Sequence, residues 1–161
     1  DINVNFLKQI IKNGVTPIIA GFQGISEELR ITTIGRGGSD TTAVAIASSL
    51  GAKRCDIYTD VEGIYSTDPN IEPKAKKISK VSYEEMLEMS SMGAKDLHKR
   101  SVALAMKNNL TLQVLSSLSN NEGTYVVDEK HLIEKEIVSG VSYSKNEAKI
   151  TISGIRDKPG I

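Results

Sequence analysis

The residues best suited to chemistry lie at positions 35–40, where the sequence reads Gly-Arg-Gly-Gly-Ser-Asp, directly before an apolar helical pattern. Three glycines leave the backbone bare, so that a ligand can approach closely. Arg36 and Asp40 carry opposite charges and suit a substrate that is itself a zwitterion. A helix that begins here also turns its free N–H groups and positive dipole end toward this stretch. A glycine-rich turn with a surface salt bridge remains the alternative interpretation.

A second group of polar residues follows a predicted buried strand at 54–59. Thr59 and Asp60 offer a hydroxyl and a carboxylate to a base or ribose, and Tyr65 can pack against a purine. In open α/β sheets, nucleotides bind at the carboxyl ends of the strands. The segment therefore favours a nucleotide site, whereas an Asx-type turn with a packed tyrosine is the structural alternative.

A third candidate is Lys95, in the segment Met-Gly-Ala-Lys-Asp-Leu-His at 92–98, where one predicted helix gives way to the next. An ammonium group there can offset the negative charge of a transferred phosphoryl group, although a lone lysine is more often simply solvated. The two histidines, His98 and His131, lack cysteine partners at ligand spacing, so we expect no zinc site. The sequence contains no Walker A loop and no G-x-S-x-G elbow.

Composition narrows the class of ligand. The 161 residues include 20 basic and 20 acidic side chains, a balance that argues against nucleic-acid or membrane partners held by bulk charge. No apolar run reaches the length of about 18 residues that a membrane span needs. The single cysteine, Cys55, cannot form an internal disulfide, which fits a cytoplasmic location. We expect it to be a buried structural thiol rather than a nucleophile.

Alternating helical and extended patterns predict an α/β fold with a three-layer open sheet. Ser39 is the expected N-cap of a helix over 40–50, and Gly51 its end. Ser82 and Glu85 have the spacing of a capping box and open a further helix. The other expected elements are a helix through 6–11, strands at 15–20, 29–34, 54–59, 111–115 and 124–127, a long loop over 60–81 and a helix over 95–108.

Three segments in this order closely resemble the aspartate kinases of the amino acid kinase family: GRGGSDTTA at 35–43, IYTDVEGIYSTDP at 57–69 and MGAKDLH at 92–98. The resemblance implies the amino acid kinase type of three-layer α/β sheet, with residues 1–133 as the C-terminal, nucleotide-binding part of the catalytic domain. Residues 134–161 would begin a ferredoxin-like ACT regulatory domain. The family's phosphate-gripping lysine–glycine segment has no counterpart here, so we expect the chain alone to be nearly inactive.

The resemblance further implies transfer of the γ-phosphoryl group of ATP to the side-chain carboxylate of L-aspartate. The product, 4-phospho-L-aspartate, enters lysine, threonine, methionine and diaminopimelate biosynthesis. Mg²⁺ would accompany ATP, with few protein ligands of its own and no metal-binding residue that we can name. A feedback amino acid, lysine or threonine, would bind the complete ACT domains of a cytoplasmic homo-oligomer, and neither nucleic acid nor membrane is expected as a partner.

The resemblance assigns roles residue by residue. Arg36 would bind a substrate carboxylate, Asp40 would hold the substrate ammonium group or orient catalytic lysines, and Lys95 would neutralise phosphate charge. Asp40 and Lys95 are thus the expected catalytic residues. The expected substrate-binding residues are Arg36, Gly37, Gly38, Ser39 and Asp40, and the expected nucleotide-binding residues are Thr59, Asp60, Tyr65, Asn70, Lys95 and Asp96.

Two positions depart from the family's pattern. Asn70 stands where arginine is common, and Lys99 follows His98 where proline is usual. Two alternatives to an aspartate kinase also stay open at this point. One is an effector-binding or oligomerisation module, favoured by the ACT-like tail, and the other is a sister amino acid kinase that acts on glutamate.

Overall fold

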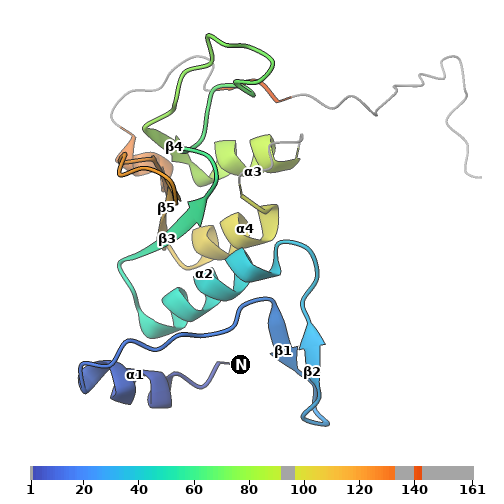
Figure 1. Cartoon of the computed structure of the whole chain (residues 1–161), viewed down its shortest axis with the longest axis vertical. Coiled ribbons are helices and arrows are strands. Elements are labelled where there is room, and N and C mark those ends of the chain that lie inside the picture. The colour runs from blue at the N-terminus through green and yellow to red at the C-terminus, as the bar shows by residue number, and fades with distance from the viewer. Residues whose placement is uncertain (1, 92–96, 133–139, 143–161) are drawn as a thin grey trace, which may run out of the picture.

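The computed structural model describes residues 2–91, 97–132 and 140–142, and these form an α/β fold, as the sequence predicts (Figure 1). A hairpin of two short strands precedes an open sheet with the strand order β3-β5-β6-β4. Along the chain the elements are α1 (Val4–Lys12), β1 (Gln23–Ile25), β2 (Ile31–Thr33), α2 (Gly38–Leu50), β3 (Arg54–Thr59), β4 (Lys80–Ser82), α3 (Tyr83–Ser91), α4 (Lys99–Lys107), β5 (Thr111–Ser116), β6 (Thr124–Val127) and the 3₁₀ turn η1 (Glu129–His131).

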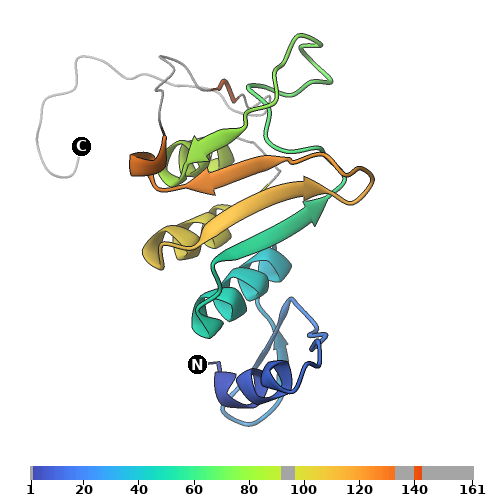
Figure 2. The ribbon, with the colours of Figure 1, turned by 90° about the vertical axis from the view of Figure 1, so that its left-hand side faces the viewer.

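The direction of the strands decides where a site can form. Strands β3 and β5 run parallel, with Arg54 opposite Thr111, whereas β6 runs antiparallel to β5 and β4 runs parallel to β6. Helices α2 and α4 each lead through a short turn into β3 and β5. The N-termini of both helices therefore lie at the edge of the sheet where β3 and β5 end, as Figures 1 and 2 show.

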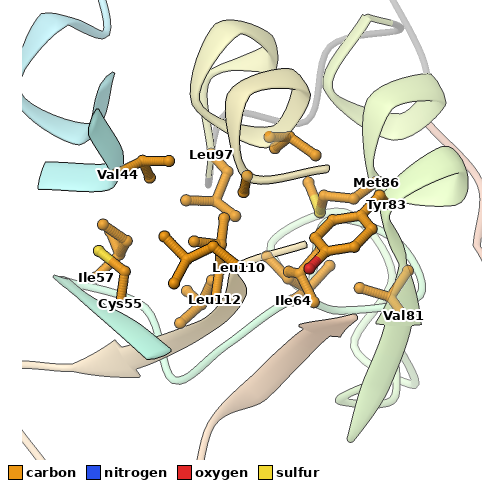
Figure 3. Packing of buried hydrophobic residues seen from close by; sticks show 14 of the residues in the cluster. Val44, Cys55, Ile57, Ile64, Val81, Tyr83, Met86, Leu97, Leu110 and Leu112 are labelled. Carbon is orange, nitrogen blue, oxygen red and sulfur yellow. The ribbon is translucent and has the colours of Figure 1, made fainter. Parts of the chain in front are cut away.

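The core lies between the sheet and one layer of helices. Helices α2, α3 and α4 cover the same face of the sheet in both views (Figures 1 and 2). Val44 of α2, Met86 of α3 and Leu112 of β5 are fully buried in this layer (Figure 3). The sheet and these helices are two layers of the predicted three-layer architecture.

Several predicted elements are confirmed. Helix α2 ends at Gly51, which has a φ of +71°, and β3 spans the expected residues 54–59. The capping box is also present, because Ser82 N–H donates to Glu85 Oε2 at 2.9 Å and Glu85 N–H donates to Ser82 Oγ at 3.2 Å. Short-range signals thus place these element boundaries correctly.

The strand predicted at 15–20 is wrong, since residues 15–20 form no strand. Ile18 is 98% exposed, and Val15 and Ile19 are exposed as well. An apolar extended segment becomes a strand only when a neighbour satisfies its backbone N–H and C=O groups, and no described strand pairs with it. The sequence did not predict β1. It also did not predict β4, which lies at the end of the loop predicted over 60–81.

Candidate functional site

The N-terminus of α2 is shaped by close packing around two glycines. Gly37 is the N-cap residue, and its φ of +71° lies in the left-handed region that favours glycine. A Cβ at Gly37 would overlap the imidazole ring of His98, and a Cβ at Gly38 would lie 2.7 Å from Ile34 Cγ1. Neither position can carry a side chain without movement of its neighbours, so the bare backbone is a requirement of the packing.

Ser39 was expected to cap α2, and this prediction is wrong. The helix starts at Gly38, so Ser39 lies inside its first turn, and the helix has no side-chain cap. The physical reason is the left-handed conformation of Gly37, which sets the start of the helix two residues earlier. The first N–H groups of α2 are consequently left without a side-chain acceptor, which is the arrangement that accepts an anionic ligand.

The two charged residues of this loop are both accessible to a ligand. Arg36 is exposed, and Asp40 is half-buried in the first turn of α2. In the described part of the chain the ion pairs are Arg30–Glu28, Arg54–Asp56 and Lys130–Asp128, none of which involves this loop. The alternative of a surface salt bridge between Arg36 and Asp40 thus finds no support, and both charges can serve a ligand.

Arg100 of α4, which the sequence did not single out, holds this loop through its backbone. Arg100 Nη2 donates to the carbonyl oxygens of Ile34, at 3.0 Å, and Arg36, at 2.5 Å. The N-cap residue of α4 is His98, whose Nδ1 accepts from Arg100 N–H at 3.3 Å. The two bonds from Arg100 Nη2 to the loop join residues more than 60 positions apart, and no local sequence signal could have found them.

The predicted nucleotide residues Thr59 and Asp60 lie at the carboxyl end of β3, as expected. The carbonyl oxygen of Thr59 accepts from Ser117 N–H at 2.8 Å and from Ser117 Oγ–H at 2.9 Å, which ties together the ends of β3 and β5. Thr59 Oγ1 accepts from Val61 N–H at 3.1 Å in a tight turn. Asp60 is exposed beside this turn, so its carboxylate can contact a ligand at this edge.

The loop after Asp60 is closed at its base by backbone pairing. Ile78 N–H donates to Ile64 O, and Ser66 N–H donates to Lys76 O, each at 2.8 Å. Tyr65, a predicted nucleotide residue, is half-buried within this pairing, opposite Lys77. Asn70 is exposed farther along the loop, where its side-chain amide donates to Asp68 Oδ1 at 3.0 Å.

Thr124 of β6 fastens the base of this loop to the sheet. Its side chain is fully buried. Thr124 Oγ1 accepts from Ile64 N–H at 2.8 Å and donates to Ile78 O at 2.5 Å. One hydroxyl therefore forms hydrogen bonds with the backbone on both sides of the loop that carries Tyr65 and Asn70. The sequence pattern of a short strand does not reveal this role.

Lys95 and Asp96 lie outside the described residues. The described residues that flank them are the end of α3 at Ser91 and the start of α4 at Lys99. Helix α4 begins at the same edge of the sheet as α2. The role of Lys95 stays a prediction.

Cys55 has the environment of a structural thiol. It is 7% exposed in β3, and burial, helped by the negative charges of Asp56 and Asp40, raises the pKa of its thiol to about 11. The thiol consequently stays protonated near neutral pH and is a poor nucleophile. The expectation that Cys55 is buried is confirmed.

Among the described residues, no group of three or more His, Cys, Asp or Glu side chains is placed to hold a metal ion. Within the same residues, none of the helices has both the length and the apolar character needed to span a membrane.

Known proteins are similar to this chain over most of its length. Residues 1–116 match the model of the amino acid kinase family. The aspartate kinase of Pseudomonas putida is 49% identical over 152 residues, which are 94% of this chain and 37% of that protein. The chain thus spans little more than a third of the length of this curated relative.

Solved structures are similar over most of this chain. E. coli aspartokinase III in complex with aspartate and ADP superimposes with a TM-score of 0.71 and 40% identity, over 78% of this chain and 28% of that one. Its complex with lysine and aspartate gives a TM-score of 0.68 and 39% identity, over 80% of this chain and 28% of that one.

Proposed function

This chain belongs to the amino acid kinase family, and on that premise we propose that it carries the aspartate side and the nucleotide side of an aspartate kinase. The reaction is transfer of the γ-phosphoryl group of ATP to the side-chain carboxylate of L-aspartate. The observation that carries the proposal is the common edge of the sheet at which the N-terminus of α2 and the ends of β3 and β5 meet (Figure 2). An amino acid and a nucleotide bound there would face one another.

The loop at 35–40 supplies groups for the amino acid. The Arg36 guanidinium suits a carboxylate, because its donors match the two oxygens, and the Asp40 carboxylate suits the ammonium group. The uncapped N–H groups of α2 add a partial positive charge on the same side. A substrate with two carboxylates and one ammonium group, such as L-aspartate, fits this distribution of charge.

The strand ends supply groups for the nucleotide. Thr59 and Asp60 are proposed to bind the ribose or base, and Tyr65 to pack against the purine. Asn70 and Asp96 are the other proposed nucleotide-binding residues. Lys95 is proposed to neutralise the phosphoryl oxygens as charge moves during transfer, which is the main way proteins catalyse this reaction. The E. coli complex with aspartate and ADP supports this assignment of ligands.

We propose Mg²⁺ as the companion of ATP. Because no group of three or more metal-binding side chains lies together among the described residues, the phosphates of ATP would supply ligands that the protein does not. The ion would offset the negative charge of the phosphate oxygens during phosphoryl transfer.

The proposal extends to regulation and assembly. Residues 1–133 would be the C-terminal part of the catalytic domain and 134–161 the start of an ACT domain, in a cytoplasmic homo-oligomer. The feedback ligand would be lysine or threonine, and the lysine complex of E. coli aspartokinase III supports the first of these. The proposed place of the reaction is the first step of lysine, threonine, methionine and diaminopimelate biosynthesis.

Replacement of Asp60 tests the nucleotide side. We expect Asp60→Ala to weaken ADP binding at least about tenfold, because a charged hydrogen bond contributes about 1.5–3 kcal/mol. Isothermal titration of the chain with ADP and Mg²⁺ measures the change. Asp56→Ala is the matched control, since Asp56 lies in β3, the strand that Asp60 follows, and its carboxylate is bound by Arg54 at 2.6 Å.

The same titrations separate the rival functions. Equal ADP affinity in the Asp60 and Asp56 variants, or no ADP binding by the unmodified chain, would count against the kinase. Binding of lysine or threonine without any nucleotide binding would favour an effector module instead.

A further inference from the structure

Arg100 occupies a position that is unfavourable for its own helix. It lies in the first turn of α4, directly after Lys99, and this turn contains no acidic residue. A positive charge at a helix N-terminus opposes the helix dipole and destabilises the helix. The placement of a guanidinium there calls for a compensating interaction elsewhere in the molecule.

The compensating interaction is with the loop at 35–40 and the residue before it. The Nη2 atom of Arg100 has two N–H groups, and they reach the carbonyl oxygens of Ile34 and Arg36 on either side of Gly35. A Cβ at Gly35 would lie 3.8 Å from the same nitrogen, so the guanidinium lies close against the backbone. Hydrogen bonds from a charged donor are stronger than neutral ones, and these two hold the backbone on both sides of Gly35.

The contact determines where Arg36 and the α2 N–H groups point. Fixing the carbonyl of Arg36 restrains the peptide plane between Arg36 and Gly37, and Gly37 already packs against His98. The loop carries no side-chain cap of its own. Its conformation consequently depends on α4, the helix that follows the segment of Lys95.

We propose that Arg100 is a positioning residue, which binds the carbonyls of Ile34 and Arg36 and thereby holds the loop at 35–40 in the geometry that recognises the amino-acid substrate. Arg100 itself touches no substrate in this account. It couples the loop at 35–40 to α4. The amino-acid side and the nucleotide side of the transfer site are thereby held in a fixed position relative to one another. The identity of the substrate rests on the proposed function. The restraint of the loop by Arg100 does not depend on it.

The test compares Arg100→Met with Lys99→Met. Both changes remove one positive charge from the first turn of α4 and keep a long unbranched side chain, but only Arg100 donates to the loop. We expect Arg100→Met to speed amide hydrogen exchange at residues 35–41 about tenfold and to weaken L-aspartate binding about tenfold. ADP affinity should change less than twofold, and Lys99→Met should leave all three measurements unchanged.

A lysine at the same position provides the rescue. Arg100→Lys retains a charged donor, so it should restore part of the exchange protection and of the aspartate affinity. Unchanged exchange in Arg100→Met, or an equal loss of aspartate and ADP affinity, would overturn the inference. Failure of the unmodified chain to bind aspartate would instead contradict the proposed function, and hydrogen exchange would still decide whether Arg100 restrains the loop.

Discussion

Replacement of Gly37 by alanine should lower the free energy of unfolding by about 3 kcal/mol and abolish measurable aspartate binding. A left-handed φ costs a non-glycine residue about 1–2 kcal/mol, and the added methyl group would overlap the His98 ring. Overpacking of this kind adds about 1–3 kcal/mol. The loop can escape the overlap only by leaving α4, which removes Arg36 from its place. Urea denaturation followed by circular dichroism measures the first effect, and calorimetric titration with aspartate the second.

Gly51→Ala separates the two causes. Gly51 ends the same helix with the same φ of +71°, but a Cβ there would meet nothing within 4 Å. This variant should therefore show the backbone cost alone, about 1 kcal/mol, and keep its affinity for aspartate. Equal losses in the two variants would show that the contact with His98 does not matter.

Replacement of Thr124 by valine should lower the free energy of unfolding by about 2–4 kcal/mol. Valine has the same shape but leaves Ile64 N–H and Ile78 O without their partner, and each unsatisfied buried group costs about 1–3 kcal/mol. Because both groups lie at the base of the loop at 64–78, ADP affinity should fall as well. Chemical denaturation and ADP titration on the same samples measure the two effects.

Thr111→Val serves as the control for Thr124→Val. Thr111 begins β5 in the same sheet and is half-buried, and valine suits a strand at least as well as threonine does. Its stability and ADP affinity should remain within about 0.5 kcal/mol and twofold of the original chain. A Thr124 variant that matched this control would refute the role of the hydroxyl.

The features that the sequence predicted are those set by neighbours along the chain. The capping box of Ser82 and Glu85, the end of α2 at Gly51 and the whole of β3 follow from spacing within a few residues. The error at Ser39 has a local cause too. Three glycines in one stretch leave the start of α2 ambiguous, and only the packing of Gly37 on His98 selects it.

The features that the sequence did not predict depend on distant partners. Strand β4 has only three residues and exists because it pairs with β6, more than 40 residues later. Residues 15–20 have the composition of a strand, but no described strand satisfies their backbone. The contacts of Arg100 with the loop and of Thr124 with Ile64 and Ile78 span similar separations. Charge and glycine content thus led to the proposed ligand-binding residues, whereas the residues that hold them in place required the fold.

The central claim is that this chain supplies the aspartate and nucleotide sides of one phosphoryl-transfer site. The most direct measurement uses a hybrid in which this chain replaces the matching part of the Pseudomonas putida aspartate kinase, which is 49% identical to it. Acyl phosphate formed from ATP is trapped with hydroxylamine, with L-aspartate or L-glutamate as acceptor. We predict turnover with L-aspartate alone and a loss of at least about 100-fold in Arg36→Ala, equal to about 2.7 kcal/mol. A folded, ADP-binding hybrid that phosphorylates L-glutamate in preference, or that forms no acyl phosphate from L-aspartate, would contradict the account.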